Sequence, residues 1–187
     1  QQGLGRAMSD QLERSPLSRG HVNFTDQTIN GLLALSASAS GRYATLDMKE
    51  ASDRISLNLV DILFDGVPKL RDALLAASTQ GVLLPDGSYL KKKKYASMGS
   101  ALCFPVMSAV HFALMLGVLN VETGEKHRAL AKTCYVYGDD LICRTKDVNF
   151  LFEGFPLFDL KFNQGKSFFR GKFRESCGID AYDGVDV

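Results

Sequence analysis

The chain has 187 residues and a mass of 20.5 kDa, which is enough for one domain with a proper hydrophobic core. Hydrophobic residues make up 45% of it and charged residues 23%, which excludes a disordered, collagen-like or disulfide-scaffold protein. The net charge is only +1, so affinity for nucleic acid would have to come from local clusters of Lys and Arg. Four scattered cysteines form no metal-binding pattern and indicate a reducing compartment. No leader opens the chain, and we interpret it as a fragment of a longer protein.

Apolar periodicity and turn residues predict a series of helices and strands. A helix capped by Thr25 or Asp26 runs to about residue 38, a strand covers 42–48, and Ser52 caps a helix to about residue 63. The elements expected next are a helix over 67–77, a hairpin over 82–94, a long apolar helix over about 101–119, strands over 133–137 and 141–144, a short helix near 148–152, and strands over 157–162 and 167–173. This order predicts an α+β fold, a largely antiparallel sheet with helices packed on one face.

The stretch between Lys94 and Glu122 carries no charge and is long enough to span a bilayer. Its helical part contains Pro105, Ser108 and His111, and its purely apolar core, residues 112–119, is too short to cross. A helix that is apolar all round is also typical of the centre of a globular protein. We therefore expect a central core helix and no membrane association.

Gly138, Asp139 and Asp140 form the sharpest motif, at the expected tip of a hairpin between two apolar strands. Two adjacent carboxylates repel each other unless a cation holds them, and the glycine allows a tight turn and the close approach of a ligand. Carboxylate oxygens are the ligands that Mg²⁺ prefers. The motif indicates a magnesium site, and the alternative is an ordinary acidic surface turn.

A second acidic position closes the expected strand 42–48. Asp47 ends this strand, and Asp53 follows near the start of the next helix. If the two strands are neighbours in one sheet, Asp47 and Asp139 converge. Such a pair is typical of a two-metal site, in which two Mg²⁺ ions about 3.5–4 Å apart clamp the attacking and leaving oxygens of a phosphoryl transfer. For Asp53 the alternative is a plain helix cap.

Two further patterns suit phosphate chemistry. Residues 97–100, Ser-Met-Gly-Ser, precede the long apolar helix, where their backbone could cradle a sugar or phosphate; the alternative is a helix cap. Five basic residues interleaved with phenylalanines predict a phosphate-facing surface, with a solvated strand edge as the alternative. These residues are Lys161, Lys166, Arg170, Lys172 and Arg174. The lysine run 91–94 is interpreted as a solvated edge.

In this order the motifs resemble the palm of viral RNA-directed RNA polymerases, and most closely the replicases of the single-stranded RNA bacteriophages, the leviviruses. Residues 45–53 resemble motif A, 97–99 motif B, 137–140 motif C, 160–167 motif D and 173–178 motif E. Residues 26–30 and 184–187 are similar to further phage stretches. The resemblance covers essentially the whole chain, which we interpret as a single unit, 1–187, with lead-in helices from the fingers side over 1–40.

The resemblance implies template-directed synthesis of RNA from ribonucleoside triphosphates, as in viral genome replication. It implies that Asp47 and Asp139 ligate two Mg²⁺ ions, with Mn²⁺ as an alternative ion, and that Asp140 assists. It also implies that Lys166 is the motif D lysine, which we expect to donate a proton to the departing pyrophosphate.

The resemblance also assigns nucleotide-binding residues. Asp53 and Ser97 would sense the ribose of the incoming nucleotide, Gly99 belongs to the same element, and residues 173–178 would lie against the primer end of the product. The sequence departs from the family's motif B in two ways. Cys103 stands where many members carry a Thr, and Pro105 follows shortly after it in the helix. No Asn partner for Asp53 is evident.

The resemblance further implies the molecules with which the chain works. These are the RNA template and product, ribonucleoside triphosphates and, by similarity to the family, host elongation factors Tu and Ts, in the cytoplasm of the infected bacterial host. The basic fingers motif is expected upstream of Gln1 and the thumb downstream of Val187. The 187 residues alone are therefore expected to be inactive, since a palm without fingers and thumb cannot hold its substrates.

Two other functions are compatible with paired aspartates at a hairpin tip. The first is a reverse transcriptase, which Gly138, Asp53 and the 97–99 element disfavour, because a polar ribose sensor suits a 2′-hydroxyl. The second is a non-catalytic RNA-binding relic of a polymerase, in which the acids would serve folding alone. The presence of all the acids favours an enzyme.

Overall fold

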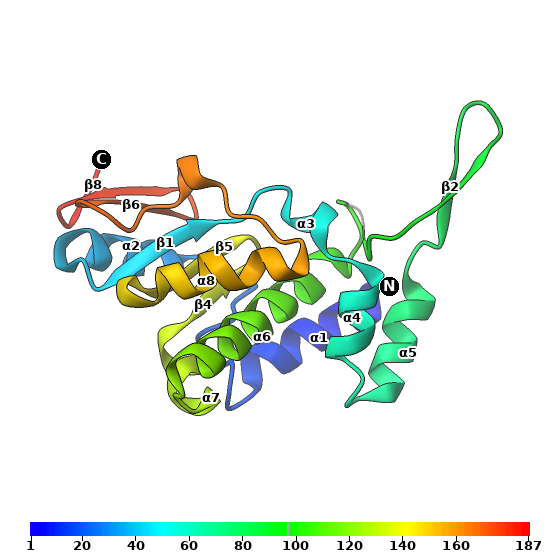
Figure 1. Ribbon diagram of the computed structural model, residues 1–187, viewed down its shortest axis with the longest axis horizontal. Coiled ribbons are helices and arrows are strands. Elements are labelled where there is room, and N and C mark those ends of the chain that lie inside the picture. The colour runs from blue at the N-terminus through cyan, green and yellow to red at the C-terminus, as the bar shows by residue number, and fades with distance from the viewer. Residues whose placement is uncertain (97) are drawn as a thin grey trace.

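The computed structural model describes residues 1–96 and 98–187 and has a mixed helical and antiparallel architecture, so the α+β expectation is confirmed (Figure 1). The helices are α1 (Gln2–Arg14), α2 (Thr28–Ser40), α3 (Ala51–Arg54), α4 (Leu57–Leu63), α5 (Pro68–Ala77), α6 (Cys103–Thr123), α7 (His127–Leu130) and α8 (Val148–Gly154). Short 3₁₀ turns are η1 (Ala131–Thr133), η2 (Thr145–Asp147), η3 (Phe155–Phe158) and η4 (Gln164–Lys166). The strands are β1 (Tyr43–Asp47), β2 (Gly81–Leu83), β3 (Tyr89–Lys91), β4 (Tyr135–Tyr137), β5 (Asp140–Arg144), β6 (Phe173–Ser176), β7 (Ile179–Tyr182) and β8 (Val185–Asp186).

The central sheet has the order β1-β5-β4, and both of its strand pairs are antiparallel. In the register of β1 and β5, Asp47 faces Asp140 and Tyr43 faces Arg144. The strands are apolar because the sheet is buried: Leu46, Leu141 and Ile142 are at most 1% exposed. The acidic ends of β1 and of the β4–β5 hairpin therefore lie together where these strands end. We call this end of the sheet the acidic edge.

Both outer edges of the central sheet are covered by irregular segments. Beside β4, the backbone N–H of Val136 donates to His21 O at 2.7 Å, and Asn23 N donates to Val136 O at 3.2 Å. Beside β1, Thr45 and Phe168 exchange two backbone hydrogen bonds, at 3.1 and 2.7 Å. The described strands of this sheet therefore leave no long open edge at which another chain could pair.

Helix α6 is the central core helix that the uncharged stretch predicts. By length and composition it could cross a bilayer, yet 61% of its most apolar window is buried inside the molecule. It packs against α1, α8 and β4, as Figure 1 shows below the central sheet. Its all-round apolar surface is explained by neighbours on several sides.

Strands β6, β7 and β8 form a second antiparallel sheet, and helix α2 packs against both β1 and this sheet. Arg174 on β6 is 1% exposed, and its guanidinium donates to three backbone carbonyl oxygens, of Tyr43 (2.8 Å), Gly171 (3.1 Å) and Phe173 (2.6 Å). Burial lowers the pKa of Arg174. This arginine therefore joins the two sheets and does not face solvent.

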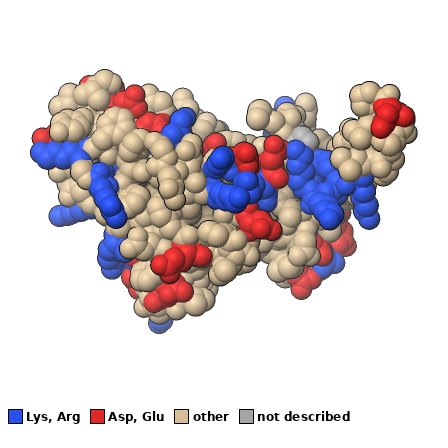
Figure 2. All heavy atoms as spheres, turned by 45° about the horizontal axis from the view of Figure 1, so that its top comes forward, with Lys and Arg blue, Asp and Glu red and all other residues tan. Residues whose placement is uncertain are grey.

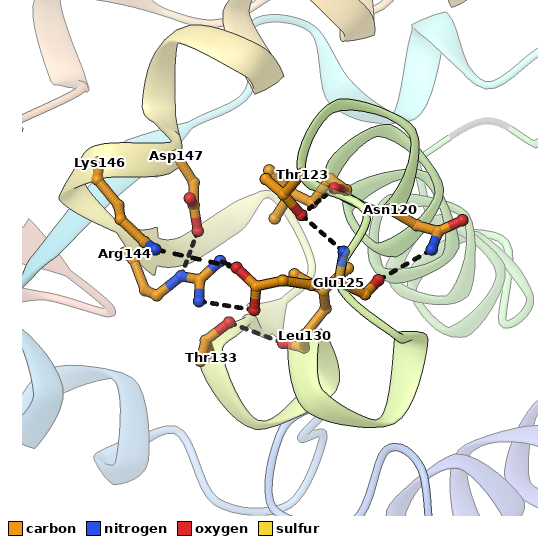
Figure 3. Close-up of polar contacts among 9 residues, drawn as sticks. Asn120, Thr123, Glu125, Leu130, Thr133, Arg144, Lys146 and Asp147 are labelled. Carbon is orange, nitrogen blue, oxygen red and sulfur yellow. Dashed lines mark hydrogen bonds and ion pairs between the residues drawn. The ribbon is translucent and has the colours of Figure 1, made fainter.

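A partly buried ionic network fixes the end of β5 that lies away from the acidic edge (Figure 3). The Arg144 guanidinium donates to both carboxylate oxygens of Glu125, at 2.7 and 3.0 Å, and to Asp147 at 2.5 Å. Asp147 is 1% exposed, so the loss of its partner would leave a buried charge uncompensated. The network holds the loop after α6 and the turn η2 against the sheet.

The structure corrects several expected elements. The helix expected from Ser52 is two helices, α3 and α4, and the capping side chain is Ser56, whose Oγ accepts from Leu59 N at 3.0 Å. Neither Thr25 nor Asp26 caps α2, because Asp26 instead accepts from Thr28 N, two residues on, in a turn before the helix. Those two predictions were wrong because several polar residues near each helix start compete for the capping position.

The strands expected over 157–162 and 167–173 are also wrong. Pro156 favours the start of a 3₁₀ turn, and residues 155–158 form η3. The rest of the segment follows β1 through isolated bridges at Phe162 and Phe168, and the regular strands begin only at Phe173. The apolar residues of this segment contact the core although its backbone is irregular. Sequence periodicity does not distinguish such a segment from a strand.

Candidate active site

The two predicted acidic strand ends meet at one edge of the central sheet. Asp47 is the last residue of β1, Asp139 lies in the turn between β4 and β5, and Met48 N donates to Asp139 O at 3.2 Å. Figure 2 brings this edge forward and shows acidic and basic side chains gathered side by side in the middle of the face. The Asp139 residue is exposed and Asp47 is half-buried. The convergence of these two residues is confirmed.

The pKa of the Asp47 carboxyl is raised from its ordinary value. Burial raises the pKa of the Asp47 carboxyl, and repulsion by Asp139 raises it further, while a hydrogen bond from the Asn163 side chain and attraction by Lys166 oppose the change. Ionised Asp47 is therefore disfavoured in the folded chain. An added cation at this point would relieve both the desolvation and the repulsion.

Asp140 points toward the turn between β6 and β7. Its Oδ2 accepts from Cys177 N at 3.2 Å and from Cys177 Sγ at 3.4 Å. Burial is the main cause that raises the pKa of Asp140, and Asp139 and Asp47 add repulsion. Burial also raises the pKa of the Cys177 thiol to about 12, so the thiol remains a donor. Asp140 thus links the acidic edge to the second sheet.

Two side chains of helix α6 fix the backbone of the acidic turn from below. Ser108 Oγ accepts from Gly138 N at 3.2 Å, and His111 Nδ1 lies 2.8 Å from Gly138 O. Both residues are 0% exposed and lie three positions apart, on one face of the helix. Burial lowers the pKa of His111 to about 4, so the ring is neutral at physiological pH and its Nδ1–H donates to the carbonyl.

Gly138 is required at this turn for two physical reasons. Its φ is +63°, in the left-handed region that favours glycine, and a Cβ at this position would overlap the Phe104 ring. Helix α6 therefore contacts Gly138 through the backbone N–H, the carbonyl and Cα. We call Ser108, His111 and Phe104 the turn clamp.

Residues of the predicted motif D run alongside Asp47. Asn163 N donates to Asp47 O at 2.8 Å, and Asp47 N donates to Ser167 Oγ at 3.3 Å. Burial raises the pKa of both Asp47 and Glu175, and attraction by Lys166 opposes part of this change in each carboxyl. The rival, Lys161, bonds through its carbonyl to Lys49 N at 2.8 Å. Of these two lysines, Lys166 is the one whose charge acts on Asp47.

Of the predicted nucleotide-binding residues, the structure describes Asp53 and Gly99. Asp53, on α3, is exposed and forms an ion pair with Lys94. Gly99 is exposed, with a φ of +94°, and Ser97 lies outside the described residues. Asp53 does not cap a helix, since α3 begins before it and Ser56 caps α4.

The expected phosphate-facing surface is smaller than the sequence indicates. Arg174 is buried, and Lys172 forms an ion pair with Asp183 at 2.6 Å. The lysine run 91–94 is likewise not a simple solvated edge, because Lys92 is only 9% exposed and Lys94 contacts Asp53. Of the five basic residues predicted, Lys161, Lys166 and Arg170 are left to face a ligand.

The donor set at the acidic edge fits Mg²⁺ when substrate completes it. Within residues 1–96 and 98–187, no three His, Cys, Asp or Glu side chains are placed to hold a metal by themselves. Mg²⁺ in polymerase sites is bound by one or two carboxylates together with waters and substrate phosphates. Asp47 and Asp139 supply such a pair, whereas the Asp140 oxygen is already bonded to Cys177.

Sequence reasoning missed the residues that position this edge. These are Ser108, His111, Asn163, Ser167 and Cys177. The available signal was the polar pair Ser108 and His111 on an otherwise apolar buried helix, because a buried polar side chain needs a partner. Nothing in the sequence indicated that the partner would be the Gly138 backbone.

Comparison with known proteins shows the family of the chain. The family model described as RNA replicase, beta-chain, matches residues 1–187. The RNA-directed RNA polymerase subunit beta of Qbeta virus (strain MX1) is 36% identical over 177 residues, which is 93% of this chain and 28% of that protein. The corresponding subunit of Escherichia virus Qbeta is 34% identical over 187 residues, 100% of this chain and 30% of that protein.

A third relative, the RNA-directed RNA polymerase beta chain of Escherichia phage MS2, is 33% identical over 171 residues, 89% of this chain and 29% of that protein. The chain thus spans less than a third of the length of these relatives. The full-length family match and the order of the motifs lead to one conclusion: the chain belongs to the RNA replicase beta-chain family.

Proposed function

We propose that this chain is the catalytic palm of an RNA-directed RNA polymerase that replicates a phage genome from ribonucleoside triphosphates on an RNA template. The observation that carries the proposal is the meeting of Asp47 and Asp139 at neighbouring strand ends, where burial and mutual repulsion make a cation favourable. The relatives are named for this activity. Their length indicates that further parts of the polymerase take part.

In the proposed reaction Asp47 and Asp139 would hold two Mg²⁺ ions, which would supply charge stabilisation for phosphoryl transfer. The turn clamp keeps the Gly138 backbone in place, and Asn163 orients the Asp47 carboxylate. Asp140 adds negative charge and anchors the turn to Cys177. Lys166, on the flank of Asp47, donates a proton to the departing pyrophosphate.

Template-dependent incorporation of labelled nucleotides tests this proposal. The polymerase chain that carries this sequence should extend RNA with ribonucleotides in the presence of Mg²⁺, and Mn²⁺ should substitute. A reverse transcriptase would prefer deoxynucleotides under the same conditions. A non-catalytic relic would bind RNA and incorporate neither. We further propose host elongation factors Tu and Ts as partners in the bacterial cytoplasm, which co-purification from infected cells would test.

We expect Asp53 to contribute to the choice of ribonucleotides. A site that hydrogen-bonds a hydroxyl discriminates against the analogue that lacks it, because the polar group is then left unpaired at a cost of about 1–3 kcal/mol. Asp53→Ala should therefore reduce the ratio of ribo- to deoxynucleotide incorporation about tenfold, measured as the two values of kcat/KM. Lys94→Ala is the matched control for loss of the ion pair alone. An unchanged ratio in Asp53→Ala would remove Asp53 from the ribose site.

We expect Lys166 to act as a proton donor and not only as a fixed charge. Arg keeps the positive charge but is a far poorer acid, so Lys166→Arg should bind triphosphate normally and slow single-turnover incorporation by about 10²-fold. Lys161→Arg is the matched control from the same motif. If Lys161→Arg is slow while Lys166→Arg matches wild type, the donor is Lys161.

A further inference from the structure

A second concave surface lies at the opposite end of the central sheet from Asp47 and Asp139. It is a groove of about 1060 Å³ between residues 15–21 on one side and α7 with η1 on the other. Figure 1 shows α7 at the bottom of the molecule, remote from α3 and the end of β1. Along β4, the four residues from Cys134 to Tyr137 span roughly 10 Å, and Asp139 lies beyond them in the turn. The groove is therefore separate from the acidic edge.

The lining of this groove is strongly basic. It contains Arg19, Lys126, Arg128 and Lys132, together with His21 and His127, and it contains no Asp or Glu. The four Lys and Arg residues are exposed, and none of them forms an ion pair within the described part of the chain. Glu125, the acid next to Lys126, is held by Arg144 away from the groove. We call this surface the basic groove.

One ring in the basic groove is held in a fixed orientation. The His21 ring contacts the Tyr135 ring, with centroids 4.6 Å apart, and its Nδ1 lies 3.2 Å from Cys134 O. The residue is half-buried and contributes to the lining. A fixed ring beside a row of cations is typical of single-stranded RNA sites, where a base stacks while phosphates contact Lys and Arg.

We propose that the basic groove binds single-stranded RNA, through phosphate contacts to Arg19, Lys126, Arg128 and Lys132 and stacking on His21, at a site distinct from the acidic edge. An acidic polypeptide would match the charges but would make no use of the ring. The chain as a whole is almost neutral, so a groove without a single acid represents a local concentration of positive charge. This inference does not depend on the proposed catalysis.

Chemical footprinting tests the site directly. In the polymerase chain carrying Asp139→Asn, a single-stranded oligonucleotide should protect Lys126 and Lys132 from acetylation by an N-hydroxysuccinimide ester at low salt. Lys69, which is exposed on α5, is the internal control and should stay reactive. Equal reactivity of Lys126 and Lys132 with and without RNA would overturn the proposal.

Salt dependence gives a second, quantitative test. Each phosphate contact on a single strand contributes about −0.7 to the slope of log K against log salt concentration. The triple variant Lys126→Gln, Arg128→Gln and Lys132→Gln should therefore bind RNA with a slope shallower by roughly 2. A control triple at exposed positions elsewhere, Arg6→Gln, Arg42→Gln and Lys69→Gln, should keep the wild-type slope. Equal salt slopes of RNA binding in the two triple variants would contradict the proposal. If, in addition, only the groove triple loses binding to polyglutamate, the groove serves an acidic protein.

Discussion

Replacement of Asp139 by Asn is expected to abolish RNA synthesis by the polymerase while leaving RNA binding nearly intact. The substitution keeps the size of the side chain but removes a carboxylate that we propose to ligate Mg²⁺. Loss of that charge stabilisation corresponds to several kcal/mol, or roughly a 10³-fold lower rate. Single-turnover incorporation and RNA-binding assays with the same preparation measure the two quantities.

Asp10→Asn, at an exposed position on α1, is the matched control and should retain wild-type activity. Wild-type turnover by Asp139→Asn would contradict the metal assignment.

The companion variant Asp47→Asn adds a readout that does not need activity. The pKa of Asp47 is raised in the folded state, so the protonated carboxyl favours folding. This contribution to the free energy of unfolding is fully present below the ordinary pKa of 3.8 and is lost as the pH rises through the raised pKa. At neutral pH without Mg²⁺, Asp47→Asn should therefore unfold at a higher urea concentration than wild type, and added Mg²⁺ should stabilise only the wild type.

The turn clamp should make His111 essential for rate although it lies beneath the acidic edge. His111→Leu leaves the buried Gly138 carbonyl without its donor, which we expect to cost about 1–3 kcal/mol of the free energy of unfolding. A displacement of Asp139 by about 1 Å would lower kcat about 10²-fold. The KM for the triphosphate should change little. Steady-state kinetics and urea unfolding measure these effects.

His111→Asn separates positioning from simple packing. Its side-chain amide N–H can take the place of the Nδ1–H group, so a large part of kcat should return despite the smaller volume. Met115→Leu, one turn further along α6 and also fully buried, controls for repacking of the core and should leave kcat unchanged. If His111→Asn is as slow as His111→Leu, the hydrogen bond to Gly138 is not what matters.

Much of the fold could be predicted where local pattern and tertiary structure agree. β1, α5, the β2–β3 hairpin, α6 and the β4–β5 hairpin lie close to their expected ranges, because apolar periodicity, proline and glycine mark them locally. The segment 157–173 was mispredicted because its phenylalanines contact the core from an irregular backbone. The division into separate sheets depends on long-range pairing, which no local pattern encodes.

The charged residues of the candidate site could be predicted from the sequence, but the residues that hold them in place could not. Asp47 and Asp139 stand at strand ends, so their meeting required only that the two strands be neighbours. The roles of Asn163 and Cys177 depend on how two irregular segments return to the sheet. Arg174 illustrates the same limit, since its basic side chain suggested a phosphate surface and its environment is the interior.

The coil segments beside β4 and β1 determine when the central sheet can be completed during synthesis of the chain. His21 and Cys134 are 113 residues apart in sequence, and Asp47 and Ser167 are 120 apart. Closing such loops costs entropy before any contact compensates, so folding should be slow. Until about residue 168 has left the ribosome, β1 exposes an apolar edge that can pair with other chains. The yield of correctly folded protein should therefore depend on chaperones and on the rate of translation through residues 134–168.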